Sequence, residues 1–316
     1  MIGFSEARMK SWLDKMFAAR LRGLLSLLLV GALLSALAAQ PSVFAQGQPD
    51  ERTGSHSARL PLALEMVERA MSAACFERKT DPLGSVPIDE MQARPSLPLA
   101  HPDAIAGSKR AERLLPAARE LTVAALRKLA DEYKLDERRL RSSTARVRAV
   151  WEIDPDMDLR DNASVAMRTP HTIHFGTIFL AGLRSDEGMV SVLAHEITHI
   201  ADGKEDALHP LFRAIGRRAS ILTGMRISGQ RAEELTCDLI GEMVARAYIE
   251  RNPNKEPLTR RMARSIEHNC VDEDDTDDDH LSPRNTMRAL FALDPSLARD
   301  VSGGLIVSTP EPARSQ

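Results

Sequence analysis

The stretch "VLAHEITHI", residues 192–200, decides how this chain folds. It places His195 and His199 four residues apart and puts Glu196 directly after the first histidine. On a helix, side chains at positions i and i+4 lie on one face, so both imidazoles point the same way. Apolar residues surround the motif and predict a buried helix, in which two histidines and a glutamate without a partner would be costly. A metal ion supplies that partner; a helix with two hydrogen-bonded histidines is the alternative interpretation.

Two histidines at this spacing can take two corners of a zinc tetrahedron. Glu196 cannot bind the same ion from its position, but it can reach a water in the open corner, which is the purpose of H-E-x-x-H in metalloproteases. A later predicted helix contains "EELTCDLIGE", in which Glu234 and Asp238 are again four apart. Glu234 can complete the set of zinc ligands, and Asp238 can accept a hydrogen bond from a ligating histidine. Glu233 is expected to be a surface charge.

Other zinc patterns fit the sequence less well. The metzincin extension needs a glycine and a histidine where this chain has Asp202 and Glu205, so that class is excluded. The chain lacks a C-x-x-C pair, which speaks against a zinc site made of thiolates. Four further histidines are expected to have structural or surface roles: His171, His174, His209 and His268.

The two motifs together resemble the zinc endopeptidases that include HtpX and the CAAX prenyl proteases. Their pattern is H-E-x-x-H followed by E-x-x-A-D, and "HEITH" and "ELTCD" match it except that Cys237 replaces the alanine. "DNASVA" resembles the N-A-F-A strand of the family, and "DDHLSPRNTMRAL" resembles its later H-P-x-x-x-R segment. In the latter, Leu281 stands in place of the proline and Thr286 in place of the arginine. The resemblance covers roughly residues 147–293.

This resemblance implies an α+β fold, a gluzincin-like metalloprotease domain that is mainly helical with a small mixed sheet and an active-site HEXXH helix. It implies one Zn²⁺ per chain, held by His195, His199 and Glu234. Glu196 is then the general base, and Asp238 accepts a hydrogen bond from a ligating histidine. The soluble, exported bacterial branch fits best, because the membrane helices of the two named groups are absent from the sequence.

Two further roles follow from the same resemblance. The strand at residues 171–175 is expected to pair with an extended polypeptide substrate through Thr172, Ile173 and His174. His280 is a candidate either for a latch that occupies the open zinc corner or for a donor to the oxyanion. A surface histidine without either role is the third interpretation.

The sequence therefore predicts a zinc endopeptidase that hydrolyses peptide bonds in exported or envelope proteins, as in protein quality control. An envelope chaperone-like or binding protein with a latent or structural metal site is the alternative. Polypeptides are the expected partners. Nucleic acid is not expected, because the net charge is −3 and aromatic residues make up only 4% of the chain.

The N-terminus predicts export. A basic start is followed by the apolar run "LLSLLLVGALLSALAA" and then by "VFA" at residues 43–45, which is the pattern of a cleaved signal peptide. The preferred cut follows Ala45, and "ALA" at residues 36–38 is a second candidate. A periplasmic protein without a membrane span after cleavage is expected, whereas an uncleaved signal that anchors the chain is the alternative.

The rest of the chain divides by composition. A proline-containing segment, residues 78–108, predicts a loop, and helical spacing follows it over residues 111–135. Strands are expected at residues 147–153, 162–167 and 171–180, a helix capped by Ser185 comes next, and a second long helix surrounds residues 233–249. One disulfide could join two of Cys75, Cys237 and Cys270. The expected organisation is a signal peptide (1–45), a linker (46–58), an N-terminal helical region (59–145), the metallopeptidase domain (146–300) and a flexible tail (301–316).

Overall fold

The computed structural model describes residues 65, 69, 96–166, 168–183, 185–252 and 279–297. Over these residues the chain is mainly helical with one small mixed sheet, which confirms the predicted α+β class. The elements, in order, are α4 (Pro102–Tyr133), α5 (Glu137–Ala149), β1 (Glu152–Asp156), β2 (Ala163–Val165), β3 (Thr172–Gly176), α6 (Thr177–Gly182), α7 (Asp186–Asp202), a short 3₁₀ turn η1 (Gly203–Glu205), α8 (His209–Thr223), α9 (Gln230–Glu250) and α11 (Pro283–Leu293).

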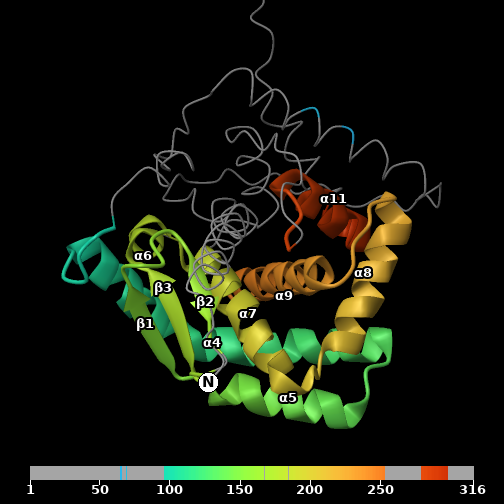
Figure 1. Cartoon of the computed structure of the whole chain (residues 1–316), viewed down its shortest axis with the longest axis horizontal. Coiled ribbons are helices and arrows are strands. Elements are labelled where there is room, and N and C mark those ends of the chain that lie inside the picture. Colours follow the sequence, from blue (N-terminus) through green and yellow to red (C-terminus); the bar gives the residue numbers. More distant parts are fainter. Residues whose placement is uncertain are drawn as a thin grey trace, which may run out of the picture.

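The helices α4, α7 and α9 form the centre of the molecule, with the sheet at one end and α8 at the other (Figure 1). α4 begins with a proline in its first turn and ends at Lys134, which adopts the left-handed conformation that terminates many helices. Its apolar side joins the same core as the motif helix, so Leu121 and Leu126 are buried in one cluster with Leu193. α4 and α7 therefore share one hydrophobic core.

The structure corrects two predicted element boundaries. Residue 146, the expected start of the metallopeptidase domain, lies within α5, which packs against α7. α4 begins at Pro102, inside the predicted loop, because proline suits the first turn of a helix. The strand expected from residue 147 begins only at Glu152, since Val147 is buried within α5. β-branched residues favour strands only weakly, and the tertiary packing of α5 overrides that preference.

The sheet has the order β1-β3-β2, with β3 parallel to β1 and antiparallel to β2. Ile173 of β3 pairs with Ile153 of β1 on one side and with Val165 of β2 on the other. β3 ends at Gly176, where a Cβ atom would lie 1.9 Å from the carbonyl oxygen of Arg160, so only glycine fits this crossing. The chain then enters α6, and the strand predicted to reach residue 180 is shorter than expected.

Several predictions fall outside the described residues. These are the signal peptide, the linker, the tail, His268, and two of the three cysteines, Cys75 and Cys270. Within the described part of the chain, no helix combines the length and the apolar character that a membrane crossing requires.

Candidate metal centre

α7 presents His195, Glu196 and His199 to the centre of the molecule. The helix begins as predicted, because the Ser185 hydroxyl accepts a hydrogen bond from the backbone N–H of Gly188 at 3.0 Å. His195 and Glu196 are each only 3% exposed, and apolar side chains of the core surround them. Burial of such polar groups requires partners, and those of His195 come from α9.

α9 packs closely against α7 at a glycine. A Cβ atom at Gly241 would lie 2.9 Å from the backbone oxygen and 2.9 Å from the hydroxyl of Ser191, so a larger residue would push the helices apart. This close approach of the helices brings the carboxylates of Glu234 and Asp238 to the histidines of α7. The helical faces that the sequence predicts for α7 and α9 therefore meet in the structure.

Four side-chain atoms gather where the two helices face each other. The Nε2 atoms of His195 and His199 are 3.1 Å apart. The Oε2 atom of Glu234 lies 3.2 Å from the first and 3.5 Å from the second. His280, which precedes α11, places its Nε2 atom 3.4 Å from the same carboxylate oxygen. The structure thus brings the three predicted zinc ligands and the predicted latch residue together.

Each histidine of α7 has a carboxylate on the other edge of its ring. His195 Nδ1 lies 2.9 Å from Asp238 Oδ1, as expected for the predicted supporting residue. His199 Nδ1 lies 2.8 Å from Glu233 Oε1. The prediction that Glu233 is a surface charge is therefore wrong: its side chain is 30% exposed and reaches the second histidine. The pair "EE" carried no signal for this contact, which depends on the distance between α7 and α9.

This arrangement fits a cation. An ionised carboxylate only accepts hydrogen bonds, so His195 and His199 donate from Nδ1 and, as neutral imidazoles, carry lone pairs on Nε2. Two nitrogen lone pairs and one carboxylate oxygen then face one another within 3.5 Å, which is repulsive unless a proton or a metal ion lies between them. Two imidazoles and one carboxylate are donors that metal ions accept, so the side chains present fit a metal ion.

The pKa shifts describe the same need for positive charge. Burial opposes the ionised form of Glu234, but His199 and His195 outweigh it and hold its pKa well below the usual range. Burial also disfavours the charged form of His195, yet the hydrogen bonds of Asp238 and Glu234 raise its pKa to about 9. In contrast, burial raises the pKa of Glu196. Glu234 therefore stays a carboxylate, while Glu196 is a carboxylate that takes up a proton readily.

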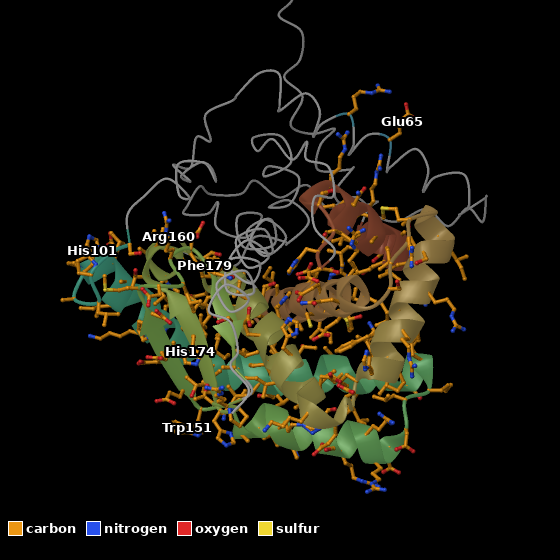
Figure 2. The ribbon with its side chains drawn as sticks, in the orientation of Figure 1. Glu65, His101, Trp151, Arg160, His174 and Phe179 are labelled. Atoms are coloured by element: carbon orange, nitrogen blue, oxygen red, sulfur yellow. The ribbon has the colours of Figure 1, made fainter. Side chains whose placement is uncertain are left out.

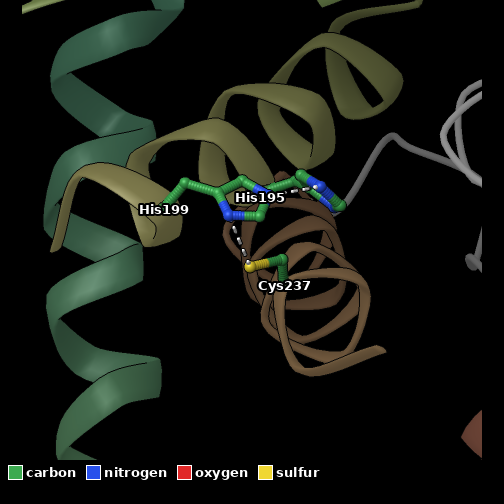
Figure 3. A group of neighbouring side chains, drawn as sticks. All are labelled: His195, His199 and Cys237. Carbon is green, nitrogen blue, oxygen red and sulfur yellow. Dashed lines mark hydrogen bonds between the residues drawn. The ribbon is translucent and has the colours of Figure 1, made fainter. Parts of the chain in front are cut away.

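A second set of donors overlaps with this one. His195, His199 and Cys237 form a buried group that could hold a metal ion (Figure 3). The Cys237 sulfur lies 3.8 Å from Nδ1 of His199, whereas Glu234 lies on the Nε2 side of the same ring. One ion cannot use both edges of one imidazole, so the two donor sets exclude each other. Burial raises the pKa of Cys237 to about 12, so this side chain is a thiol unless a bound cation deprotonates it.

The gathered atoms line a cleft of about 760 Å³. Its walls come from β2, from the C-terminal half of α7 with η1, from the start of α9 and from α5. Glu196 and His280 also line it, so both reach the same space as the histidines. A cleft of this size lies within the usual range of ligand-binding pockets.

The predicted substrate strand is wrong in its position. Thr172, Ile173 and His174 belong to β3, the central strand, whose backbone pairs with β1 on one side and β2 on the other. His174 lies on the sheet (Figure 2), with Nδ1 2.9 Å from an oxygen of Asp154 and Nε2 3.1 Å from the hydroxyl of Thr169. The strand that lines the cleft is β2, which is an edge strand. Strand order is a tertiary property that the alternation of residues does not reveal.

The comparisons add no relative to this description. The chain matched no family model, no curated protein and no solved structure.

Proposed function

We propose that this chain is a zinc-dependent endopeptidase with a gluzincin-like domain similar to that of HtpX and the CAAX prenyl proteases. The convergence of His195, His199 and Glu234 carries the proposal, because it gathers two nitrogens and one carboxylate oxygen. Three protein ligands with one open position are typical of catalytic zinc sites, whereas structural sites are closed by four. A zinc ion held there would act as a Lewis acid and lower the pKa of a water in the open position.

Glu196 is the general base of the proposed reaction. It takes a proton from the attacking water as the water oxygen bonds to the peptide carbonyl carbon, and it passes that proton to the leaving nitrogen as the C–N bond breaks. Burial supports both steps, because it raises the pKa of this carboxyl and so makes the protonated form accessible. A structural metal site has no need of such a residue.

The substrate is proposed to be an extended segment of an exported or envelope protein. Among the described residues β2 is an edge strand beside the cleft, and backbone hydrogen bonds to such an edge give affinity with little demand on sequence. This suits unfolded polypeptides and hence a role in protein quality control. Export to a bacterial periplasm rests on the N-terminal pattern of the sequence.

The decisive experiment compares Glu196→Gln with the wild-type chain. The variant should keep about one zinc per chain, measured by elemental analysis, and lose hydrolysis of unfolded casein by about 10²- to 10⁴-fold. Glu242→Gln is a matched control, because it makes the same change in another buried carboxylate away from the cleft. Undiminished hydrolysis by Glu196→Gln would refute the mechanism. A wild-type chain that binds zinc but hydrolyses nothing would favour the chaperone-like or binding protein.

A further inference from the structure

His199 differs from His195 in having two neighbours at Nδ1. Glu233 Oε1 lies 2.8 Å away and Cys237 Sγ lies 3.8 Å away. His195 Nδ1 instead pairs with Asp238, which is 2% exposed. The ring of His195 is thus fixed with Nε2 towards the cleft, whereas the ring of His199 has an alternative set of donors on its other edge.

The two neighbours of His199 direct it to different metal sites. When Nδ1 donates to Glu233, the lone pair is on Nε2, beside His195 and Glu234. When Nδ1 carries the lone pair, it faces the sulfur of Cys237. The first site combines nitrogen and oxygen donors and the second includes sulfur, which softer metals prefer.

We propose that Glu233 is a positioning residue that selects the first site by holding the proton of His199 on Nδ1. This inference rests on the proposed function, in which His195, His199 and Glu234 bind the zinc ion. The hydrogen bond from a histidine to a carboxylate is charge-assisted and short, whereas a sulfur at 3.8 Å offers at most a weak contact. Glu233 therefore decides which nitrogen of His199 serves as ligand and keeps Cys237 out of the metal site.

Loss of the Glu233 carboxylate should have two linked effects. Zinc affinity falls about 10- to 100-fold, the usual effect of removing the hydrogen-bond partner of a ligating histidine. His199 also becomes able to present Nδ1 together with the Cys237 sulfur. A thiophilic metal should then recruit that sulfur, which the wild-type arrangement excludes. A merely structural role of Glu233 would change stability without changing the identity of the ligands.

The test uses cobalt and cadmium in place of zinc. A cobalt–thiolate bond gives a strong charge-transfer absorption in the near ultraviolet, which imidazole and carboxylate ligands do not. We expect this band to be absent from the wild-type chain, present in Glu233→Ala and absent from Glu233→Ala/Cys237→Ala. Glu233→Gln should show no band, because its amide oxygen still accepts a hydrogen bond from His199. Cadmium affinity relative to zinc should rise in Glu233→Ala and in no other of these variants.

The outcomes separate this inference from the proposed function. If Glu233→Ala shows no thiolate band and binds zinc as tightly as the wild type, the positioning role is wrong, whether or not the wild type hydrolyses polypeptides. A thiolate band in the wild type would overturn the set of His195, His199 and Glu234 itself. Should the alanine variant not fold, Glu233→Met replaces it, because methionine has a similar length and no strong hydrogen-bond acceptor. The cobalt–thiolate band and the zinc and cadmium affinities of this variant then decide the question.

Discussion

Glu234 and Glu242 lie two turns apart on α9 and are almost equally buried, at 8% and 3% exposure. Their pKa values move in opposite directions. Burial opposes ionisation of both, but His199 and His195 hold the pKa of Glu234 well below the usual range. At Glu242 burial prevails over the nearby Arg246 and raises the pKa to about 7. The same helix thus carries one carboxylate that stays charged and one that holds a proton.

The partners explain the difference. Glu242 accepts a hydrogen bond from Arg246 through Oε1, but its Oε2 has no hydrogen-bond partner within the described part of the chain. The hydroxyl of Ser191 on α7 likewise has no hydrogen-bond partner among the described residues. Around Glu234 the polar atoms converge, and around Glu242 they do not. Burial by itself therefore identifies no site on α9; the convergence of several donors does.

The largest expected effect is on metal binding. Glu234→Gln should lower zinc affinity by more than about 100-fold, because it removes a ligand rather than the partner of a ligand. Glu242→Gln, the same substitution two turns away, should bind zinc as the wild type does. Competition with a fluorescent chelator measures both. If both variants lost zinc affinity equally, the loss would reflect damage to α9 and would not locate the metal site at Glu234.

The second expected effect is on stability and concerns Glu242. Below pH 4.5, the ordinary pKa of a glutamate side chain, the carboxyl is protonated in both the folded and the unfolded chain and carries no penalty. Between this value and about 7 the folded chain keeps a proton that the unfolded chain releases, so the free energy of unfolding falls as pH rises. The loss amounts to about 3 kcal/mol.

Glu242→Gln removes that titration. Relative to the wild type it should gain about 3 kcal/mol between pH 4.5 and pH 8 and little below that range. Urea unfolding of both proteins at a series of pH values gives the difference directly, and groups shared by the two cancel. A difference that does not change with pH would mean that Glu242 is charged in the folded chain, and the contrast with Glu234 would disappear.

Asp238 lies one turn from each glutamate and tests where the site ends. Its bond to His195 places it with Glu234. Asp238→Ala should lower zinc affinity about 10- to 100-fold, less than the loss of a ligand. Asp238→Asn should be milder, since its oxygen still accepts a hydrogen bond. An alanine variant with unchanged zinc affinity would move the boundary of the site to Glu234 and leave Asp238 as an ordinary buried carboxylate.

The parts of this site that were predictable are those that helix geometry determines. Residues four apart share a face, so "HEITH" and "ELTCD" alone indicate which side chains of α7 and α9 can meet. The contact of Glu233 was not predictable, because its reach depends on how closely α7 and α9 approach at Gly241. The position of β3 in the sheet was missed for a similar reason, since strand order depends on chain topology and not on the pattern within one strand.

The smallest expected effect concerns His280, which comes to the site from outside the α7–α9 pair. Its side chain is 14% exposed and lines the cleft, with Nε2 3.4 Å from Glu234 Oε2. We infer that it occupies the open position of the metal in a resting state, since a fourth protein ligand would close the site and block hydrolysis. His280→Ala should then raise basal hydrolysis of an unfolded peptide by about 2- to 10-fold, as expected for a latch that is closed about 50 to 90% of the time. The measurement compares the two proteins at equal zinc content. A lower rate would identify His280 as a donor to the oxyanion, and an unchanged rate would leave the polar partners that matter on α7 and α9 alone.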